Sequence, residues 1–343
     1  MRIIIDAMSG DKAPGEIVRG AVDAHKEFGA EILLVGQPEA IHACLTDCGA
    51  AESDSISIHP ASDIIDMHDD PSTAVRRKRD SSMAVALDLL VKGEGDAVIS
   101  AGNTGALLTG ATLIAKRIRG IRRAALAPVL PNGDKGVVLI DCGANVECTP
   151  EYLLQFALMG SLYSQTILGC ANPRVGLLNN GAEDTKGTPL CKETYALLKA
   201  AAEAGRLNFI GNVEGSEVFS GGVDVIVTDG FTGNILLKSI EGTAKFIMKN
   251  MKAALMSSIK AKLGAALVSG ELRGLKKLLD VNEVGGTAFL GIRKPVIKAH
   301  GSSDARAIRS AVRQAIAFVN ADVIGKIEAN LDAMRLDAPT EKD

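Results

Sequence analysis

The sequence predicts an α/β protein in which helices cover both faces of a mostly parallel sheet, in three layers. Short apolar runs alternate with amphipathic stretches along the chain. Most of these runs are almost continuously aliphatic, as in strands that are buried on both faces. Aromatic residues make up only 3% of the chain and hydrophobic residues 47%. The core must therefore be aliphatic, which suits helices packed on a buried sheet.

Nine segments are expected to form strands, and the stretches between them read as helices. Ala13–Phe28, Met83–Lys92 and Pro150–Leu168 are among the amphipathic stretches. This alternation predicts βαβ units in an open sheet. We expect one catalytic α/β domain over residues 1–336, with a division into two lobes left open, and a disordered tail over 337–343. The expected strands are Arg2–Asp6, Glu31–Val35, Ser55–His59, Asp96–Ser100, Gly136–Asp141, Arg174–Asn179, Asn208–Gly211, Val223–Thr228 and Val296–Ala299.

Composition and charge argue against several classes of protein. The net charge of −3 gives no basic field for nucleic acid. The chain starts directly in an apolar strand, without the pattern of a signal peptide, and no run of about 18 uncharged apolar residues predicts a membrane span. Six cysteines form no C-x-x-C pair, so we interpret them as reduced thiols in the cytoplasm. A redox pair of Cys142 and Cys148 is less favoured than two small buried hydrophobes.

Polar, glycine-rich turns follow six of the expected strands. Ligands of open α/β sheets bind beyond the carboxyl ends of the strands, so a shared active-site rim is predicted there. The alternative is routine turn chemistry, which Gly, Asn and Asp also serve. The six turns are Asp6–Asp11, Ser100–Gly105, Asp141–Asn145, Asn179–Gly181, Asp229–Asn234 and His300–Asp304.

Two of these turns resemble each other. The segment Asp96–Leu108 aligns without gaps on Asp224–Leu236, with five identical residues that include Gly-x-Thr-Gly in both. A glycine-rich turn that opens a helix leaves backbone N–H groups unpaired, and these attract an anion such as phosphate. Coincidence between two βα turns is the alternative. Neither turn is a P-loop, and no G-x-G-x-x-G occurs, so the sequence has no signature of a nucleotide cofactor.

Two side chains near the rim are candidates for catalysis. Lys186, between a strand and a helix, is predicted to meet a phosphate or a developing oxyanion, although a solvated loop lysine is the alternative. His300 is the only one of five histidines at a polar strand end, where a neutral imidazole can donate to an anion or relay a proton. Ser302, Ser303 and Asp304 can cap the next helix, and capping can coexist with ligand binding.

Other catalytic signatures are missing from the sequence. It contains no G-x-S-x-G nucleophile elbow and no H-E-x-x-H or Cys/His cluster with metal spacing. Asp6, Asp11, Asp141 and Asp229 could gather Mg²⁺, but carboxylates that accept backbone N–H bonds at strand ends are favoured. We therefore expect neither a metal nor a cofactor.

Eight segments in collinear order, from the N-terminus to about residue 320, closely resemble those of bacterial phosphate acyltransferases. Together they are far more specific than any single motif. The segments are Asp6–Pro14, Ser100–Ala106, Asp141–Asn145, Pro150–Ala157, Thr185–Gly187, Asn208–Gly215, Asp229–Asn234 and Lys298–Arg306.

The resemblance implies a fold like that of the decarboxylating isocitrate and isopropylmalate dehydrogenases, and a homodimer. It also implies transfer of a fatty acyl group from acyl carrier protein to inorganic phosphate, which gives acyl phosphate for phospholipid synthesis. Phosphate is then the nucleophile, so the protein must position the reactants and stabilise an oxyanion. The catalytic candidates are Lys186, His300 and Asn234. The binding candidates are Asp6, Gly102, Asn103, Thr104, Gly105, Asp141, Asn145, Asn179, Asp229, Thr232, Gly233, Ser302 and Ser303.

A basic amphipathic segment over 243–279 is predicted to project from the domain. Residues 243–270 include five lysines and no acid, and apolar residues recur at helical spacing. A second short helix is expected through Leu272 and Leu279. Such helices lie on anionic membranes or dock acidic partners such as acyl carrier protein. A dimer helix with a solvated lysine face is the alternative.

Membrane contact would place the protein at the inner face of the cell membrane, where a membrane-bound glycerol-3-phosphate acyltransferase takes over the product. Two other functions stay open at this point. One is a decarboxylating, nicotinamide-dependent dehydrogenase on the same fold. The other is a non-enzymatic, membrane-associated scaffold for acyl carrier protein.

Overall fold

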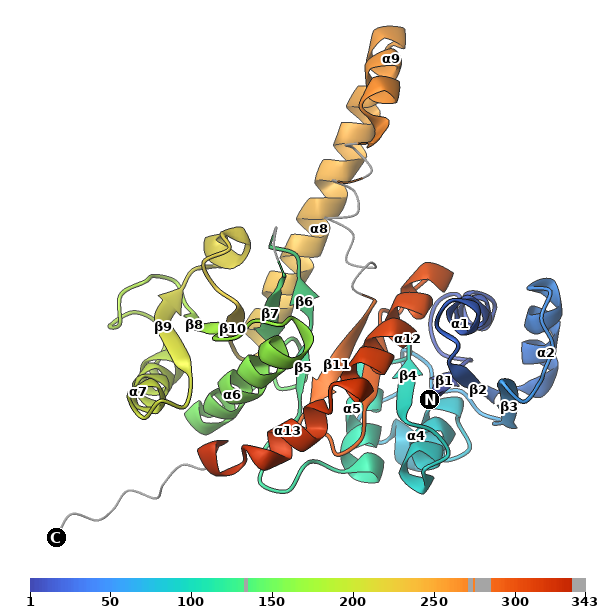
Figure 1. The fold of residues 1–343 in the computed structure, drawn as a ribbon, viewed down its shortest axis with the longest axis horizontal. Coiled ribbons are helices and arrows are strands. Elements are labelled where there is room, and N and C mark those ends of the chain that lie inside the picture. Colours follow the sequence, from blue (N-terminus) through green and yellow to red (C-terminus); the bar gives the residue numbers. More distant parts are fainter. Residues whose placement is uncertain (133–134, 271–273, 275–284, 335–343) are drawn as a thin grey trace.

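The strands are divided between two sheets, where the sequence predicted one (Figure 1). The computed structural model describes residues 1–132, 135–270, 274 and 285–334. The larger sheet has the strand order β3 (Ile56–Pro60), β2 (Glu31–Gly36), β1 (Arg2–Asp6), β4 (Ala97–Ser100), β12 (Val296–Ala299), β11 (Gly286–Leu290) and β5 (Ala125–Ala127). The smaller has the order β6 (Val129–Leu130), β7 (Val137–Ile140), β10 (Val225–Val227), β8 (Arg174–Leu178) and β9 (Asn208–Val213).

The pairing is mostly parallel, as predicted. In the larger sheet β3, β2, β1, β4 and β12 pair in parallel, and β11 lies antiparallel to both β12 and β5. In the smaller sheet only the β6–β7 pair is antiparallel. Strands β5, β6 and β11 were not predicted. β5 and β6 are short and are separated only by Pro128, so the chain crosses from one sheet to the other at that residue.

Helices cover both sheets, in the predicted α/β arrangement (Figure 1). A short π-helix, Ala111–Ala115, follows α5, and 3₁₀ turns occur at Gly215–Phe219 and Asp332–Met334. The α-helices are α1 (Gly15–Phe28), α2 (Pro38–Asp47), α3 (Ala74–Arg77), α4 (Ser82–Lys92), α5 (Thr104–Gly110), α6 (Pro150–Ile167), α7 (Pro189–Glu203), α8 (Gly230–Leu255), α9 (Ile259–Leu267), α12 (Ala305–Asn320) and α13 (Val323–Ala329).

The nearly continuous apolar runs of the strands are explained by burial on both faces, as predicted. Successive side chains of a strand point to opposite faces. Ile3 and Ile5 of β1 therefore pack in the cluster that holds α1 and α12, and Ile4 packs in the cluster that holds α4 and α5. In the smaller sheet, Val138 of β7 packs in the cluster of α6 and Leu139 in the cluster of α8. Both faces are thus buried along β1 and β7, whereas the edge strands β3 and β9 are partly exposed.

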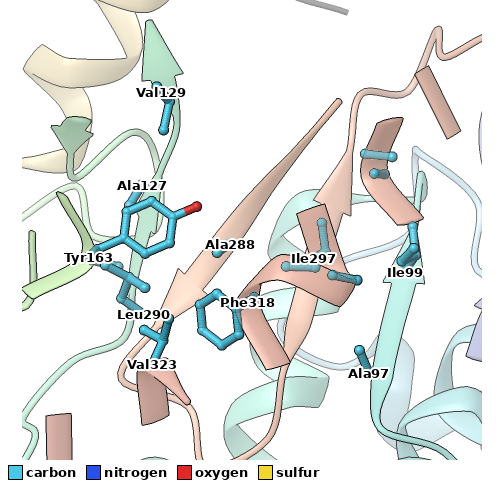
Figure 2. Close-up of a cluster of buried hydrophobic side chains, with 14 of the residues drawn as sticks. Ala97, Ile99, Ala127, Val129, Tyr163, Ala288, Leu290, Ile297, Phe318 and Val323 are labelled. Carbon is cyan, nitrogen blue, oxygen red and sulfur yellow. The ribbon is translucent and has the colours of Figure 1, made fainter. Parts of the chain in front are cut away.

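One hydrophobic core extends across both sheets, and two aromatic rings lie at its centre (Figure 2). Tyr163 of α6 and Phe318 of α12 have ring centroids 6.1 Å apart. The Tyr163 hydroxyl accepts a 3.0 Å hydrogen bond from the Gln314 side chain, and burial raises the Tyr163 pKa to about 12. A helix of the smaller sheet is therefore joined to a helix of the larger one by apolar contact and by a buried hydrogen bond.

Helices α8 and α9 project away from both sheets (Figure 1). α8 has 26 residues and a length of about 39 Å, yet only Gly230, Gly233 and Leu237 are buried along it. α9 has no buried residue. The predicted projecting segment thus begins inside α8, whereas its second short helix and the predicted tail over 337–343 lie outside the described residues. Within the described ranges, no helix is long and apolar enough to cross a membrane.

Close packing of α1 on α12 requires glycine at position 20. A Cβ atom added to Gly20 would lie 2.5 Å from the backbone oxygen of Ala305 and 2.7 Å from Ile308 Cβ. Replacing Gly20 by Ala should therefore lower the free energy of unfolding by about 1–3 kcal/mol, measured by urea denaturation. Gly15→Ala in the same helix is the control, because nothing lies within 4 Å of its added Cβ. Equal stabilities of the two variants would contradict this account of the packing.

Candidate active site

A cavity of about 570 Å³ lies where the two sheets meet, and four of the predicted site residues line it. Thr104 comes from the start of α5, Asn234 from the first turns of α8, and His300 and Ser302 from the turn after β12. The other lining residues are Leu126, Pro128, Val129, Cys142, Gly143, Leu237, Lys238, Glu241, Ala244, Lys245, Met248, Gly285, Gly286, Thr287 and Lys298.

The cavity wall has both cationic and apolar parts. Lys238, Lys245, Lys298 and His300 provide nitrogen groups that can meet an anion, and Glu241 is the one carboxylate among the lining residues. The apolar lining comes from β5, β6, Pro128 and α8 and consists of Leu126, Pro128, Val129, Leu237, Ala244 and Met248. A ligand with an anionic end and an apolar chain matches this wall.

Lys298 is a buried lysine in the cavity wall that the sequence analysis did not single out. It is the only charged residue of β12, and its side chain is 7% exposed. Burial and the nearby charge of Lys238 lower the Lys298 pKa to about 8, against the opposing effect of Asp6 and Asp11. Its ammonium group donates to the Ala299 carbonyl. The feature of the sequence that could have identified Lys298 is its position as a lysine inside an otherwise apolar predicted strand.

His300 lies between a serine and a lysine. Its Nδ1 is 2.9 Å from Ser302 Oγ and accepts a 3.2 Å bond from the Ser302 N–H, while its Nε2 is 3.3 Å from Lys238 Nζ. Burial first, and the Lys238 charge second, lower the pKa of His300 below its ordinary value. The imidazole is therefore neutral near pH 7. Lys238 is held in place by a 2.9 Å ion pair with Glu241.

The two Gly-x-Thr-Gly turns both open helices, but their threonines differ. At α5, Asn103 Oδ1 caps the helix by accepting from Ala106 N at 3.1 Å, and Thr104 lines the cavity. At α8, Asp229 caps the helix and its Oδ2 also accepts from Thr232 Oγ1 at 2.8 Å. The Thr232 hydroxyl is thus engaged in the cap, and Asn234 lines the cavity instead.

The predicted glycines allow close approach of backbone segments. A Cβ on Gly233 would lie 2.0 Å from the Asp141 carbonyl oxygen, and a Cβ on Gly102 would meet Met83 and Ser9. A Cβ on Gly105 would lie 2.7 Å from Pro71 Cβ. Larger residues at these positions would displace the turns that form the cavity.

Buried carboxylates hold the strand ends together. Asp141 Oδ1 accepts from Leu126 N at 2.8 Å, and its Oδ2 accepts from the backbone and side-chain nitrogens of Asn145 at 2.7 and 3.0 Å. Burial raises the Asp141 pKa, and these donors partly offset that effect. Asp6 accepts a 2.6 Å bond from Ser100 Oγ, which in turn accepts from Gly102 N. These contacts match the turn chemistry that the sequence analysis favoured over a Mg²⁺ cluster.

The other predicted residues lie beside the cavity or away from it. Ser303 is buried, and its Oγ has no hydrogen-bond partner within the described part of the chain. Asn179 and Lys186 lie on the loop after β8, where the Asn179 side chain donates to the Lys186 carbonyl at 3.2 Å. Lys186 is exposed and is not part of the cavity wall.

The cysteines near the cavity are poor nucleophiles. Burial and the Asp141 charge raise the pKa of Cys148 to about 12 and that of Cys142 well above its ordinary value. Since the thiolate is the reactive form, both stay protonated at neutral pH. Among the described residues, no group of three or more His, Cys, Asp or Glu side chains is placed to hold a metal ion.

The fold and the cavity define an α/β enzyme whose site pairs a cationic end with an apolar wall. A sequence model of the family described as "Fatty acid synthesis protein" matches residues 1–326. The phosphate acyltransferase of Geobacillus thermodenitrificans is 50% identical over 97% of this chain and 99% of its own. That of Thermoanaerobacterium thermosaccharolyticum is 45% identical over the full length of both chains. The chain therefore belongs to the phosphate acyltransferase family, and it is an acyltransferase.

Solved structures with the same fold confirm the expected α/β architecture and its likeness to dehydrogenases. A phosphotransacetylase from Streptococcus pyogenes has a TM-score of 0.60 at 19% identity and covers 95% of this chain and 94% of its own. A 4-hydroxythreonine-4-phosphate dehydrogenase from Klebsiella pneumoniae has a TM-score of 0.54 at 12% identity and covers 93% and 99%. At these identities the comparison concerns the fold alone.

Burial of Lys298 should be measurable as a pH-dependent cost. Its pKa falls from 10.5 to about 8 on folding, so the unfolded chain binds more protons between these pH values. The free energy of unfolding should therefore rise with pH across this window in the wild type. In Lys298→Met this rise is lost, so the stability advantage of the variant should shrink by roughly 3 kcal/mol from pH 8 to 10.5. Parallel curves from urea denaturation would contradict the burial of a charged lysine.

Proposed function

We propose that this enzyme transfers a fatty acyl group from acyl carrier protein to inorganic phosphate, giving acyl phosphate and free carrier protein for phospholipid synthesis. The observation that carries the proposal is one cavity that joins three lysines and a histidine to an apolar wall. Membership of a family whose members are named phosphate acyltransferase supports phosphate as the acceptor. No cofactor is required.

The reaction needs positioning and charge stabilisation more than a protein nucleophile. A phosphate oxygen attacks the thioester carbonyl carbon and forms a tetrahedral oxyanion. The C–S bond then breaks, and the carrier leaves as a thiolate that takes up a proton. A thioester is already activated, so holding the reactants together and stabilising the oxyanion supply the catalysis.

The residues of the cavity suit these roles. Lys298 and Lys238 provide positive charge for the phosphate, and Thr104 and Asn234 add a hydroxyl and an amide. Neutral His300 can donate to the oxyanion. It can also take the proton of the attacking hydrogen phosphate and then, as imidazolium, pass it to the thiolate. Lys186 is outside the cavity wall. It can act at the thioester only if part of the substrate extends beyond the cavity. The apolar lining suits the acyl chain.

Two observations weigh against the alternative functions. The relatives at 45–50% identity are named acyltransferases and not dehydrogenases. A non-enzymatic scaffold would have no use for a buried lysine, whose burial is costly unless a partner compensates it.

Lys298→Met tests the phosphate site directly. Loss of the ammonium group should lower kcat/KM for phosphate by about 100-fold, since one well-placed donor has an effect of this order. In the wild type, kcat/KM for phosphate should fall as pH rises above about 8, where Lys298 loses its proton. Acyl phosphate formation from palmitoyl-carrier protein is the assay, and Lys199→Met on α7 is the control. A Lys298→Met enzyme with wild-type kcat/KM would remove the proposed role.

We further propose that α8 and α9 bring the enzyme, as a homodimer, to the anionic inner face of the cell membrane. Ile259, Leu263 and Leu267 recur at helical spacing and are 79%, 64% and 86% exposed. Lys260 and Lys262 lie between Ile259 and Leu263, and each basic residue near an anionic surface contributes about 1 kcal/mol. A labile, apolar product released there reaches a membrane-bound glycerol-3-phosphate acyltransferase without crossing water.

The double variant Ile259→Glu/Leu263→Glu should abolish co-sedimentation with anionic vesicles. Both side chains are exposed, so activity on soluble carrier protein should be retained. The control is Lys192→Glu/Lys199→Glu on α7, which adds more negative charge elsewhere. If the Ile259 and Leu263 changes instead dissociate a dimer, α9 is an interface and the membrane proposal is wrong.

A further inference from the structure

A second hollow, lined by three arginines, lies next to the candidate site. It has a volume of about 450 Å³, and we call it the arginine hollow. Arg76 comes from α3, Arg117 from the segment after the π-helix, and Arg123 from the segment before β5. The remaining lining residues are Ser72, Leu108, Thr109, Thr112, Leu113, Ala124, Ala144, Asn145 and Glu147.

The positive charge of the arginine hollow is not neutralised by the protein. In the part of the chain that the structure describes, none of its three guanidinium groups forms an ion pair. Arg123 stacks over the Tyr152 ring at 5.3 Å, and Arg117 donates to the Ile121 carbonyl at 3.5 Å. Glu147 is the single acid of the lining, which leaves a net charge of +2 from three arginines and one glutamate.

Apolar side chains accompany these arginines at the surface. Leu113, in the lining, is 40% exposed, and Val146, beside Glu147 in sequence, is 65% exposed. Docking surfaces of proteins are enriched in arginine, and acids are depleted at their centre, where the contact is more apolar than the rest of the surface. The composition of the arginine hollow therefore fits a protein partner better than it fits solvent.

The arginine hollow and the candidate site lie on two sides of the same elements. Cys142 and Gly143 line the active-site cavity, and the next residues, Ala144 and Asn145, line the arginine hollow. Helix α5 contributes Thr104 to the cavity and Leu108 to the arginine hollow. A molecule bound in the arginine hollow is thus adjacent to the reacting groups.

The backbone around Arg117 is fixed in an unusual conformation. Lys116 has φ 67° and ψ 158°, a region that is almost restricted to glycine. The Lys116 carbonyl accepts from Arg293 N at 2.9 Å, and Ile118 N donates to the Gly291 carbonyl at 2.9 Å. The π-helix Ala111–Ala115 directly precedes Lys116, and π-helical turns are frequent at functional sites. Arg117 is therefore presented by a segment that is anchored on both sides.

We propose that the arginine hollow is the docking surface for the acidic face of acyl carrier protein. The proposal rests on the function proposed above, in which the carrier delivers the acyl thioester. Arginines that form no ion pair with the described residues, next to exposed apolar side chains, are complementary to an acidic protein. Charge complementarity of this kind guides and orients association. Docking there holds the carrier beside the cavity that its thioester must enter.

The test is the double variant Arg76→Glu/Arg123→Glu with two substrates. For palmitoyl-carrier protein at low salt, KM should rise roughly tenfold, because each reversed charge replaces attraction to an acidic partner by repulsion. For palmitoyl-pantetheine 4′-phosphate, which lacks the protein, KM should not change. kcat and the KM for phosphate should also stay at wild-type values. Lys192→Glu/Lys199→Glu on α7 is the matched control, and thermal unfolding checks that each variant is folded.

Two outcomes would overturn the docking proposal. If KM rises equally for both thioesters, the arginine hollow binds the phosphate of the pantetheine arm and not the carrier protein. If neither KM changes, and fluorescence anisotropy shows wild-type affinity for the carrier, the surface has no role in docking. Failure of the wild type to form acyl phosphate from either thioester would instead refute the proposed function. The anisotropy measurement needs no turnover, so it tests docking independently of that function.

Discussion

The buried carboxylate of Asp141 is the constraint on which the candidate site depends. It accepts from Leu126 N of the larger sheet and from Asn145 of its own loop, at the point where the two sheets meet. The backbone of the same residue contacts α8 so closely that position 233 has no room for a side chain. One residue therefore fixes the β5 wall of the cavity, the loop that separates the cavity from the arginine hollow, and the first turn of the long helix. A buried acceptor with several N–H donors is costly to disturb, since each lost partner leaves an unsatisfied polar group.

The like charges of the cavity lower the stability of the protein when no anion is bound between them. Burial lowers the pKa of both His300 and Lys298; the Lys238 charge lowers both further, and the Lys298 charge also lowers that of His300. Like charges at close range in a poorly solvated site repel one another, and an anion between them removes that repulsion. Functional sites commonly carry such perturbed groups. Glu241 keeps Lys238 in place without neutralising the cluster, because the cavity contains more cationic nitrogen than carboxylate.

The sequence was sufficient for the parts of the fold that depend on local pattern. The aliphatic runs of β1, β4 and β10 and the polar turns after them follow from burial on both faces and from helix capping. Strands β5, β6 and β11 were missed, since Pro128 breaks one run and two of the strands have only two or three residues. The environment of Lys298 could not be read from spacing, because its burial depends on strands that are distant in the sequence. The repeat of Gly-x-Thr-Gly could be recognised in the sequence. The hydrogen bond from the Thr232 hydroxyl to Asp229 depends on side-chain geometry and could not.

Helix α8 connects the cavity with α9, which carries the two most exposed large apolar residues of the described chain, Ile259 and Leu267. Asn234 lies about 7 Å from the cap of α8, whereas Leu255 lies about 39 Å from it, at 1.5 Å per residue. If α8 pivots at its cap as a rigid rod, a tilt of about 10° moves its far end by roughly 7 Å and Asn234 by only about 1 Å. The displacement is thus several times larger at the far end of α8 than at Asn234. Under such a tilt, a surface in contact with the far end of α8 moves over several ångströms, while the geometry around the reacting groups is conserved.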